Sequence, residues 1–257
     1  MTDTSPFDPV GHESVAIAVV DQIESMIVDG ILKEGRKLPS ERELSDAMGV
    51  SRPKLREALQ ILEERGLIHV RHGEGSFVAQ LTGRAMSPAL LSLYARHGNA
   101  FYDYLEYRRE QEAFAARMAA DRATQSDKDR IREIIRDMQV AWEQDDSDAS
   151  QEADLRLHVA VVDASQNTTL IHMMASIYDL TRQGVFYNRE FLRTMDGTGK
   201  ALLDQHIEIA DAILNGDPDR AETAARVHMD FVENSFRKGQ EQLEREARAA
   251  KRRKLSF

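Results

Sequence analysis

Hydrophobic residues recur every three to four positions along most of this chain, a spacing that predicts α-helices. The first such stretch covers residues 15–28, and its apolar face consists of Val15, Val19, Ile23 and Ile27. Ser40 and Glu43 have the spacing of a capping box, so a second helix is expected to begin there. Gly49 marks its expected end.

A third helix and a hairpin follow. Ser51 is expected to cap the helix, and Leu55, Ala58, Leu59 and Leu62 would form its apolar face. Residues 67–71 and 76–78 have the pattern of short strands, and the glycine-containing segment 72–75 predicts a tight turn between them. This order of elements is that of a winged helix-turn-helix. We therefore assign residues 1–79 to such a domain.

The pattern changes after residue 79. Residues 79–87 are small, polar and aperiodic, and Ser87-Pro88 has the order of a helix start. We place a linker and a first connecting helix at residues 80–98. From residue 99 to residue 257 the spacing is helical and strand patterns are missing, which predicts six or seven helices after the linker. The predicted fold class is mainly α, a winged helix-turn-helix followed by an all-α helical bundle.

Composition excludes several classes of protein. The chain has no cysteine, so disulfides, zinc fingers and thiolate catalysis are ruled out. Hydrophobic residues make up 42%, which is enough for buried cores. The first residues do not have the order of a secretory signal, and no apolar run approaches the roughly 20 residues of a membrane span. We expect a soluble cytoplasmic protein with no membrane partner.

The net charge of -10 argues against a general nucleic-acid coat, but charge is unevenly distributed. Residues 36–56 carry six basic and three acidic side chains, and residues 237–254 carry eight basic and three acidic ones. We interpret the C-terminal excess as a solvated helix end, with an additional DNA contact as the alternative. The excess at residues 36–56 coincides with the predicted helix-turn-helix.

The start of the third predicted helix presents Ser51, Arg52, Lys54 and Arg56. The helix dipole is positive at this end, and such side chains can reach base edges or phosphates. Arginine offers a bidentate fork to guanine, whereas lysine suits phosphate. Taken alone, the same cations are equally typical of a solvated helix end.

The segment LPSERELSDAMGVSRPKLREALQILEERGLIHVRHGEGSFVA, residues 38–79, resembles the DNA-binding domain of the GntR family of bacterial regulators. The resemblance implies a homodimer that reads an inverted-repeat operator in double-stranded DNA, with the third helix in the major groove and the wing in the minor groove. It places Arg42, Ser51, Arg52, Arg56, His72 and Gly73 on DNA-contacting positions. We expect Arg52 and Arg56 to read bases and Arg42, Ser51 and Lys54 to contact the backbone. Pro53 and Glu74 depart from the family pattern. Pro53 removes one possible contact, and Glu74 places a negative charge at the wing tip, next to the expected phosphates.

A second set of residues points inward in the predicted bundle. Asp154 and His158 are four apart and share a helical face, while His206 and His228 each lie on an apolar face of a later helix. One carboxylate and three imidazoles suit zinc, nickel, manganese or iron. The alternative is that the histidines are ordinary core residues.

Residues 153–170 and 205–232 resemble the helical effector domain, called FCD, of the FadR-type branch of GntR regulators. The resemblance implies a divalent metal, zinc first, on Asp154, His158, His206 and His228. It also implies a small carboxylate effector beside the metal, with Arg108 as an effector contact. The alternative for Arg108 is a surface ion pair with Glu112 at i+4.

These inferences predict a DNA-binding transcriptional regulator, specifically a repressor, whose DNA affinity depends on the effector. Two alternatives stay open from sequence. One is a hydrolase in which the metal activates water, with Asp163 or Glu208 as the base. The other is a DNA-binding protein whose metal is purely structural.

Overall fold

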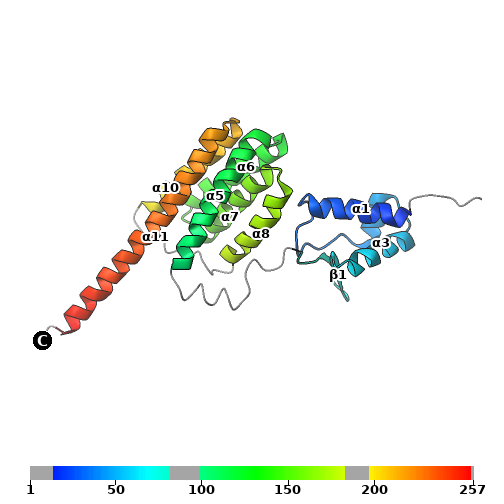
Figure 1. The fold of residues 1–257 in the computed structure, drawn as a ribbon, viewed down its shortest axis with the longest axis horizontal. Helices are drawn as coiled ribbons and strands as arrows, with labels where there is room; N and C mark the ends of the chain where they lie inside the picture. Colours follow the sequence, from blue (N-terminus) through cyan, green and yellow to red (C-terminus); the bar gives the residue numbers. More distant parts are fainter. Residues whose placement is uncertain (1–13, 82–98, 183–196, 256–257) are drawn as a thin grey trace, which may run out of the picture. The chain divides into compact units, whose positions relative to one another are not determined.

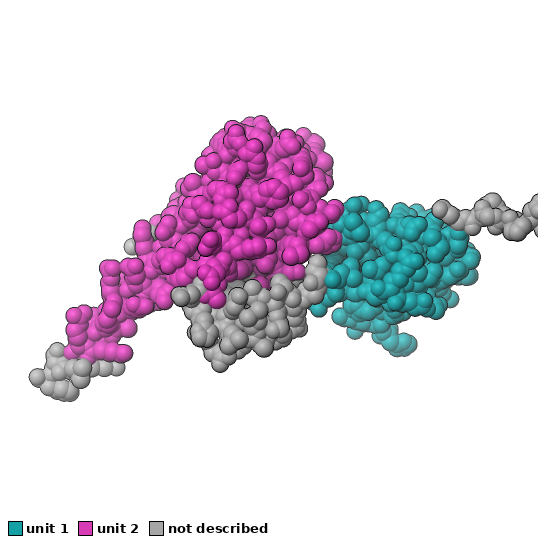
Figure 2. Space-filling view, viewed as in Figure 1, with its two compact units in different colours: residues 1–83 teal, residues 84–257 magenta. Residues whose placement is uncertain are grey.

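A computed structural model describes residues 14–81, 99–182 and 197–255 of the chain. The chain divides into two compact units, residues 1–83 and 84–257 (Figure 2). Most of the predicted linker and connecting helix, residues 80–98, lies outside the described residues, which end at Leu81 before this gap. Each unit has its own hydrophobic core, with one cluster of buried side chains in each.

The described part of the first unit, residues 14–81, contains three helices, namely α1 (Val15–Val28), α2 (Glu41–Met48) and α3 (Arg52–Glu64). The predicted capping box is present, since the Ser40 side chain accepts from the Glu43 N–H and the Glu43 side chain accepts from the Ser40 N–H. Gly49 ends α2 in the left-handed conformation, with φ of 64°. The apolar faces of α1 and α3 pack together, although Val15 at the start of α1 is exposed.

The wing is an antiparallel hairpin of β1 (Ile68–Arg71) and β2 (Gly75–Val78). Its register pairs Ile68 with Val78, and these two residues are buried against the helices. The segment before α2 pairs with the other edge of β2 through a bridge between Lys37 and Phe77. Together these elements form the winged helix-turn-helix that the sequence predicts.

The second unit is all-α in the part of the chain that the structure describes (Figure 1). Its helices are α5 (Asn99–Arg122), α6 (Gln125–Glu143), α7 (Ser147–Ala164), α8 (Thr168–Arg182), α10 (Thr198–Leu214) and α11 (Pro218–Leu255). The long α11 packs along α5 and α10, while α7 packs on α5 and α6. The bundle interior between α5, α7, α10 and α11 is where the predicted metal ligands lie.

The last part of α11 runs beyond the bundle (Figure 1). Residues 241–253 of this helix are all exposed. The basic residues at the C-terminus therefore lie on a solvated helix. None of the described helices combines the length and the apolar composition that crossing a membrane would require.

Candidate DNA-binding and metal-binding sites

The N-terminal end of α3 presents its three cations to solvent, as the sequence predicts. Arg52 and Arg56 keep 56% and 60% of their side-chain surface exposed, and Lys54 keeps 48%. Leu55 between them is fully buried, so the helix is held against the core by one face while the opposite face is available to a partner. Such a face can approach a nucleic acid without any rearrangement of the core.

Carboxylates accompany these cations. Oε2 of Glu41, at the start of α2, lies 2.8 Å from Nε of Arg56 and 3.6 Å from an Nη atom of Arg52. Lys54 pairs with Glu57 one turn later at 2.7 Å. Sequence reasoning did not identify Glu41, because its contact with Arg56 spans 15 residues and depends on how α2 packs on α3.

Ser51 occupies the N-cap position of α3, but its side chain makes no capping hydrogen bond, contrary to the sequence expectation. The other predicted contacts are exposed: Arg42 on α2, and His72 and Gly73 in the turn of the wing. Gly73 adopts a φ of 78°, which glycine tolerates best. Oε2 of Glu74 lies 3.5 Å from Nη1 of Arg71, so the guanidinium partly offsets the negative charge of Glu74 at the wing.

The bundle brings together all four predicted metal ligands. Asp154 and His158 come from α7, His206 from α10 and His228 from α11, and all four are buried. One nitrogen from each histidine lies within 4.8 Å of the others. Oδ1 of Asp154 lies 3.2 Å from Nε2 of His206 and 3.9 Å from Nε2 of His158.

This donor set fits a divalent transition metal. Burial, together with the neighbouring His206 and His158, lowers the pKa of His228 well below its ordinary value. A neutral imidazole keeps a nitrogen lone pair for a metal, and three imidazoles with one carboxylate suit zinc and its neighbours. The cluster could therefore hold one metal ion.

Arg108 and Glu112 on α5 form a buried pair, which differs from the surface pair that the sequence left as the alternative for Arg108. Only 3% of Arg108 and 5% of Glu112 is exposed. Nε of Arg108 donates to Oε1 of Glu112 at 2.8 Å, and Oε2 of Glu112 lies 2.6 Å from Nδ1 of His158. Burial would raise the pKa of Glu112, but the guanidinium of Arg108 and the contact with His158 outweigh this effect and hold that pKa well below its ordinary value.

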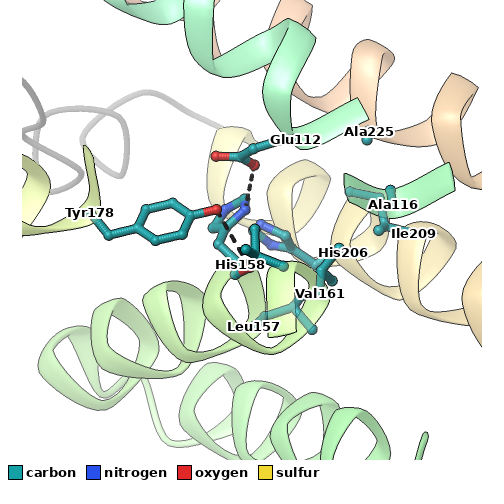
Figure 3. A pocket seen from close by; sticks show the side chains of 10 residues that line it. Glu112, Ala116, Leu157, His158, Val161, Tyr178, His206, Ile209 and Ala225 are labelled. Carbon is teal, nitrogen blue, oxygen red and sulfur yellow. Dashed lines mark hydrogen bonds and ion pairs between the residues drawn. The ribbon is translucent and has the colours of Figure 1, made fainter. Parts of the chain in front are cut away.

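A cavity of about 10 Å³ lies beside this network, room for a single water-sized occupant (Figure 3). The lining includes Glu112, His158, Tyr178 and His206. The hydroxyl of Tyr178 donates to the backbone oxygen of His158 at 3.4 Å. The cavity therefore borders both the histidine cluster and the buried carboxylate.

The two residues imagined as a hydrolytic base are engaged elsewhere. Asp163 pairs with Arg130 at 2.9 Å, and Glu208 makes two hydrogen bonds with Arg220, at 2.7 and 2.8 Å. Neither residue lines the cavity beside the histidines. The geometry therefore puts neither Asp163 nor Glu208 in the position of a base beside the histidines.

Each of the two units matches a known protein family. Residues 16–78 match the family described as "Bacterial regulatory proteins, gntR family", and residues 103–231 match the FCD domain. A "Putative L-lactate dehydrogenase operon regulatory protein" of Escherichia coli (strain K12) is 33% identical over 237 residues, covering 90% of this chain and 89% of that protein. The "Glc operon transcriptional activator" of the same strain is 34% identical over 221 residues, covering 85% and 87%.

One more relative and one solved structure also match the chain. The "HTH-type transcriptional regulator LutR" of Bacillus subtilis (strain 168) is 30% identical over 210 residues, covering 81% of this chain and 95% of that protein. The structure titled "Streptococcus agalactiae GntR" has a TM-score of 0.53 at 24% identity, covering 86% of this chain and 100% of that one, and shows the same fold. The hydrolase alternative is wrong, because the family consists of transcriptional regulators. The chain belongs to the GntR family, in the FadR-type branch with an FCD domain, and is a DNA-binding transcriptional regulator.

Proposed function

We propose that this regulator is a repressor that binds an inverted-repeat operator as a homodimer and is controlled by a small carboxylate bound near a divalent metal. The observation that carries the proposal is the convergence of three buried histidines from α7, α10 and α11 on one point. Burying three imidazoles and a carboxylate in a helical core is costly unless a partner compensates. A metal ion is the partner that suits this donor set.

On DNA, Arg52 and Arg56 would read bases, while Arg42, Ser51 and Lys54 would position the phosphate backbone. His72 and Gly73 would bring the wing to the minor groove. The exposure of the cations at the start of α3 supports these roles. Two copies of the domain are needed to read the two half-sites of an inverted repeat.

The metal would be held by Asp154, His158, His206 and His228, with zinc as the first candidate and nickel, manganese or iron as alternatives. A bound metal with an open coordination position supplies a Lewis-acidic partner for one carboxylate oxygen. Arg108 is the proposed second contact, and an effector that reached it would compete with Glu112 for the guanidinium.

The small size of the cavity supports the proposal that effector binding changes the conformation of the bundle. A cavity of about 10 Å³ holds one water-sized occupant, whereas a hydroxy acid or keto acid has several non-hydrogen atoms. Its binding would have to move the lining side chains, so the two states of the bundle would differ. An effector can shift DNA affinity only through such a difference.

The test measures metal content and DNA affinity on one purified sample of the full chain. Metal is quantified by mass spectrometry, and affinity for the protein's own upstream region is measured at fixed salt with and without a panel of carboxylates. L-lactate heads the panel, because one relative is named for an L-lactate dehydrogenase operon. Pyruvate and glycolate follow it.

About one divalent ion per chain, and operator binding that one carboxylate weakens, are the expected results. Tighter operator binding with the carboxylate would contradict repression relieved by the effector. Metal-loaded protein whose DNA affinity no carboxylate changes would favour the purely structural metal. Metal-free protein that still binds DNA specifically would indicate that the three histidines are ordinary core residues.

A further inference from the structure

A buried carboxylate lies directly behind one of the proposed metal ligands. Oε2 of Glu112, on α5, is 2.6 Å from Nδ1 of His158, on α7 (Figure 3). Exposure of the two side chains is only 6% and 9%, so the contact is shielded from water. It joins residues on two different helices that are 46 positions apart in sequence, and the pattern of neither helix predicts it.

The chemistry of this contact sets the tautomer of His158. An ionised carboxylate only accepts hydrogen bonds, so the proton of a neutral His158 ring belongs on Nδ1. The lone pair then lies on Nε2, the atom that faces Asp154 at 3.9 Å. Nε2 is therefore the nitrogen that points into the proposed metal site.

Glu112 is itself held in place. Arg108, one turn earlier on α5, donates to Oε1 of Glu112, so the carboxylate accepts from a guanidinium on one oxygen and an imidazole on the other. The guanidinium carbon of Arg108 lies 5.8 Å from the ring centroid of Tyr104 and 5.7 Å from that of Tyr178. These aromatic faces restrict where the guanidinium can go.

We infer that Glu112 is a positioning residue for the metal site, which orients His158 and presents its Nε2 to the ion, with Arg108 anchoring Glu112. This inference rests on the proposed metal binding and adds a role for two residues outside the ligand set. Hydrogen-bonded carboxylates behind metal-binding histidines fix the ring orientation and raise ligand basicity. Their loss costs about 10- to 100-fold in metal affinity.

The experiment compares the full-length chain with E112Q, which keeps the shape of the side chain but removes its charge. Affinity for Zn²⁺ is measured by competition with a chelator, and the visible absorption of bound Co²⁺ reports ligand geometry. The protonated nitrogen of His158 is identified by ¹⁵N NMR of the metal-free protein. E110Q is the matched control, because Glu110 lies on the same helix and pairs with Arg226 at the surface.

We expect E110Q to match the unaltered chain, and E112Q to bind Zn²⁺ about 10- to 100-fold more weakly, with an altered Co²⁺ spectrum. The proton on Nδ1 of His158 should be present in the unaltered chain and lost or redistributed in E112Q. If E112Q fails to fold, E112D keeps the charge and should bind more weakly than the unaltered chain while retaining that proton. A fold-neutral E112Q with unchanged affinity and an unchanged tautomer would overturn the inference. A lack of metal binding by the unaltered chain would instead contradict the proposed function, and the inference with it.

Discussion

Oε2 of Glu41 lies 2.8 Å from Nε of Arg56, so a carboxylate on α2 forms an ion pair with one of the two arginines proposed to read DNA bases. The same oxygen lies 3.6 Å from Arg52. One carboxylate therefore lies within ion-pair distance of both arginines. A phosphate or a base edge must compete with this carboxylate to engage them.

Replacing Glu41 by glutamine should tighten binding to DNA of random sequence. The change removes a negative charge beside the phosphates and releases the two arginines. Exposed ion pairs are worth about 0.2–1 kcal/mol, so the gain should not exceed about fivefold and should shrink as salt is added. Binding is measured by fluorescence anisotropy at several salt concentrations.

The control for this substitution is E64Q at the opposite end of α3, where Glu64 accepts from Gln60. It should leave DNA affinity unchanged. Equal affinity of E41Q and E64Q for random DNA would show that Glu41 does not compete with phosphate for the arginines.

Two serines at helix starts should respond differently to substitution by alanine. Ser40→Ala removes a capping bond to the Glu43 N–H and should cost about 0.5–2 kcal/mol in unfolding free energy. Ser51→Ala removes no capping bond, so it should cost less, but it should weaken operator binding if Ser51 contacts the backbone. Circular dichroism during denaturation and anisotropy with operator DNA separate the two effects. A Ser51→Ala variant as destabilised as Ser40→Ala would mean that Ser51 caps α3 in solution.

Replacing His206 by glutamine should abolish stoichiometric metal binding. His206 is fully buried and lies 3.2 Å from Asp154, so it faces the centre of the proposed site. In the unaltered chain, free metal at 100 times Kd should stabilise folding by about 2.7 kcal/mol, and chelation should remove that gain. Thermal unfolding with and without Zn²⁺ measures it.

H172Q serves as its control, since His172 lies on α8 outside the cluster. This variant should keep both the metal and the metal-dependent rise in melting temperature. Retention of about one ion per chain by H206Q would assign the metal to other ligands.

Deletion of residues 244–257 should leave folding stability within about 0.5 kcal/mol of the full chain, because the described side chains of this segment are all exposed. If the segment is only a solvated helix end, the salt dependence of operator binding should also stay unchanged. A loss of about 0.9 in the slope of log affinity against log salt for each phosphate contact would assign the basic tail to DNA.

The sequence alone determined the elements whose interactions are local. The capping box of Ser40 and Glu43 spans three residues, and the inward faces of the helices follow from a 3.6-residue period. That period also placed Asp154, His158, His206 and His228 on inward faces. The resemblance to known regulators supplied the expectation that they meet.

Only the tertiary structure decided which helix faces touch. A surface pair of Arg108 with Glu112 was the alternative to an effector contact, because a helical spacing of four does not show whether another helix covers that face of α5. Their burial puts Glu112 on His158, just as the packing of α2 on α3 puts Glu41 on Arg56. Such contacts depend on how one helix packs on another. That packing depends on the fit of whole side-chain surfaces rather than on spacing along either helix.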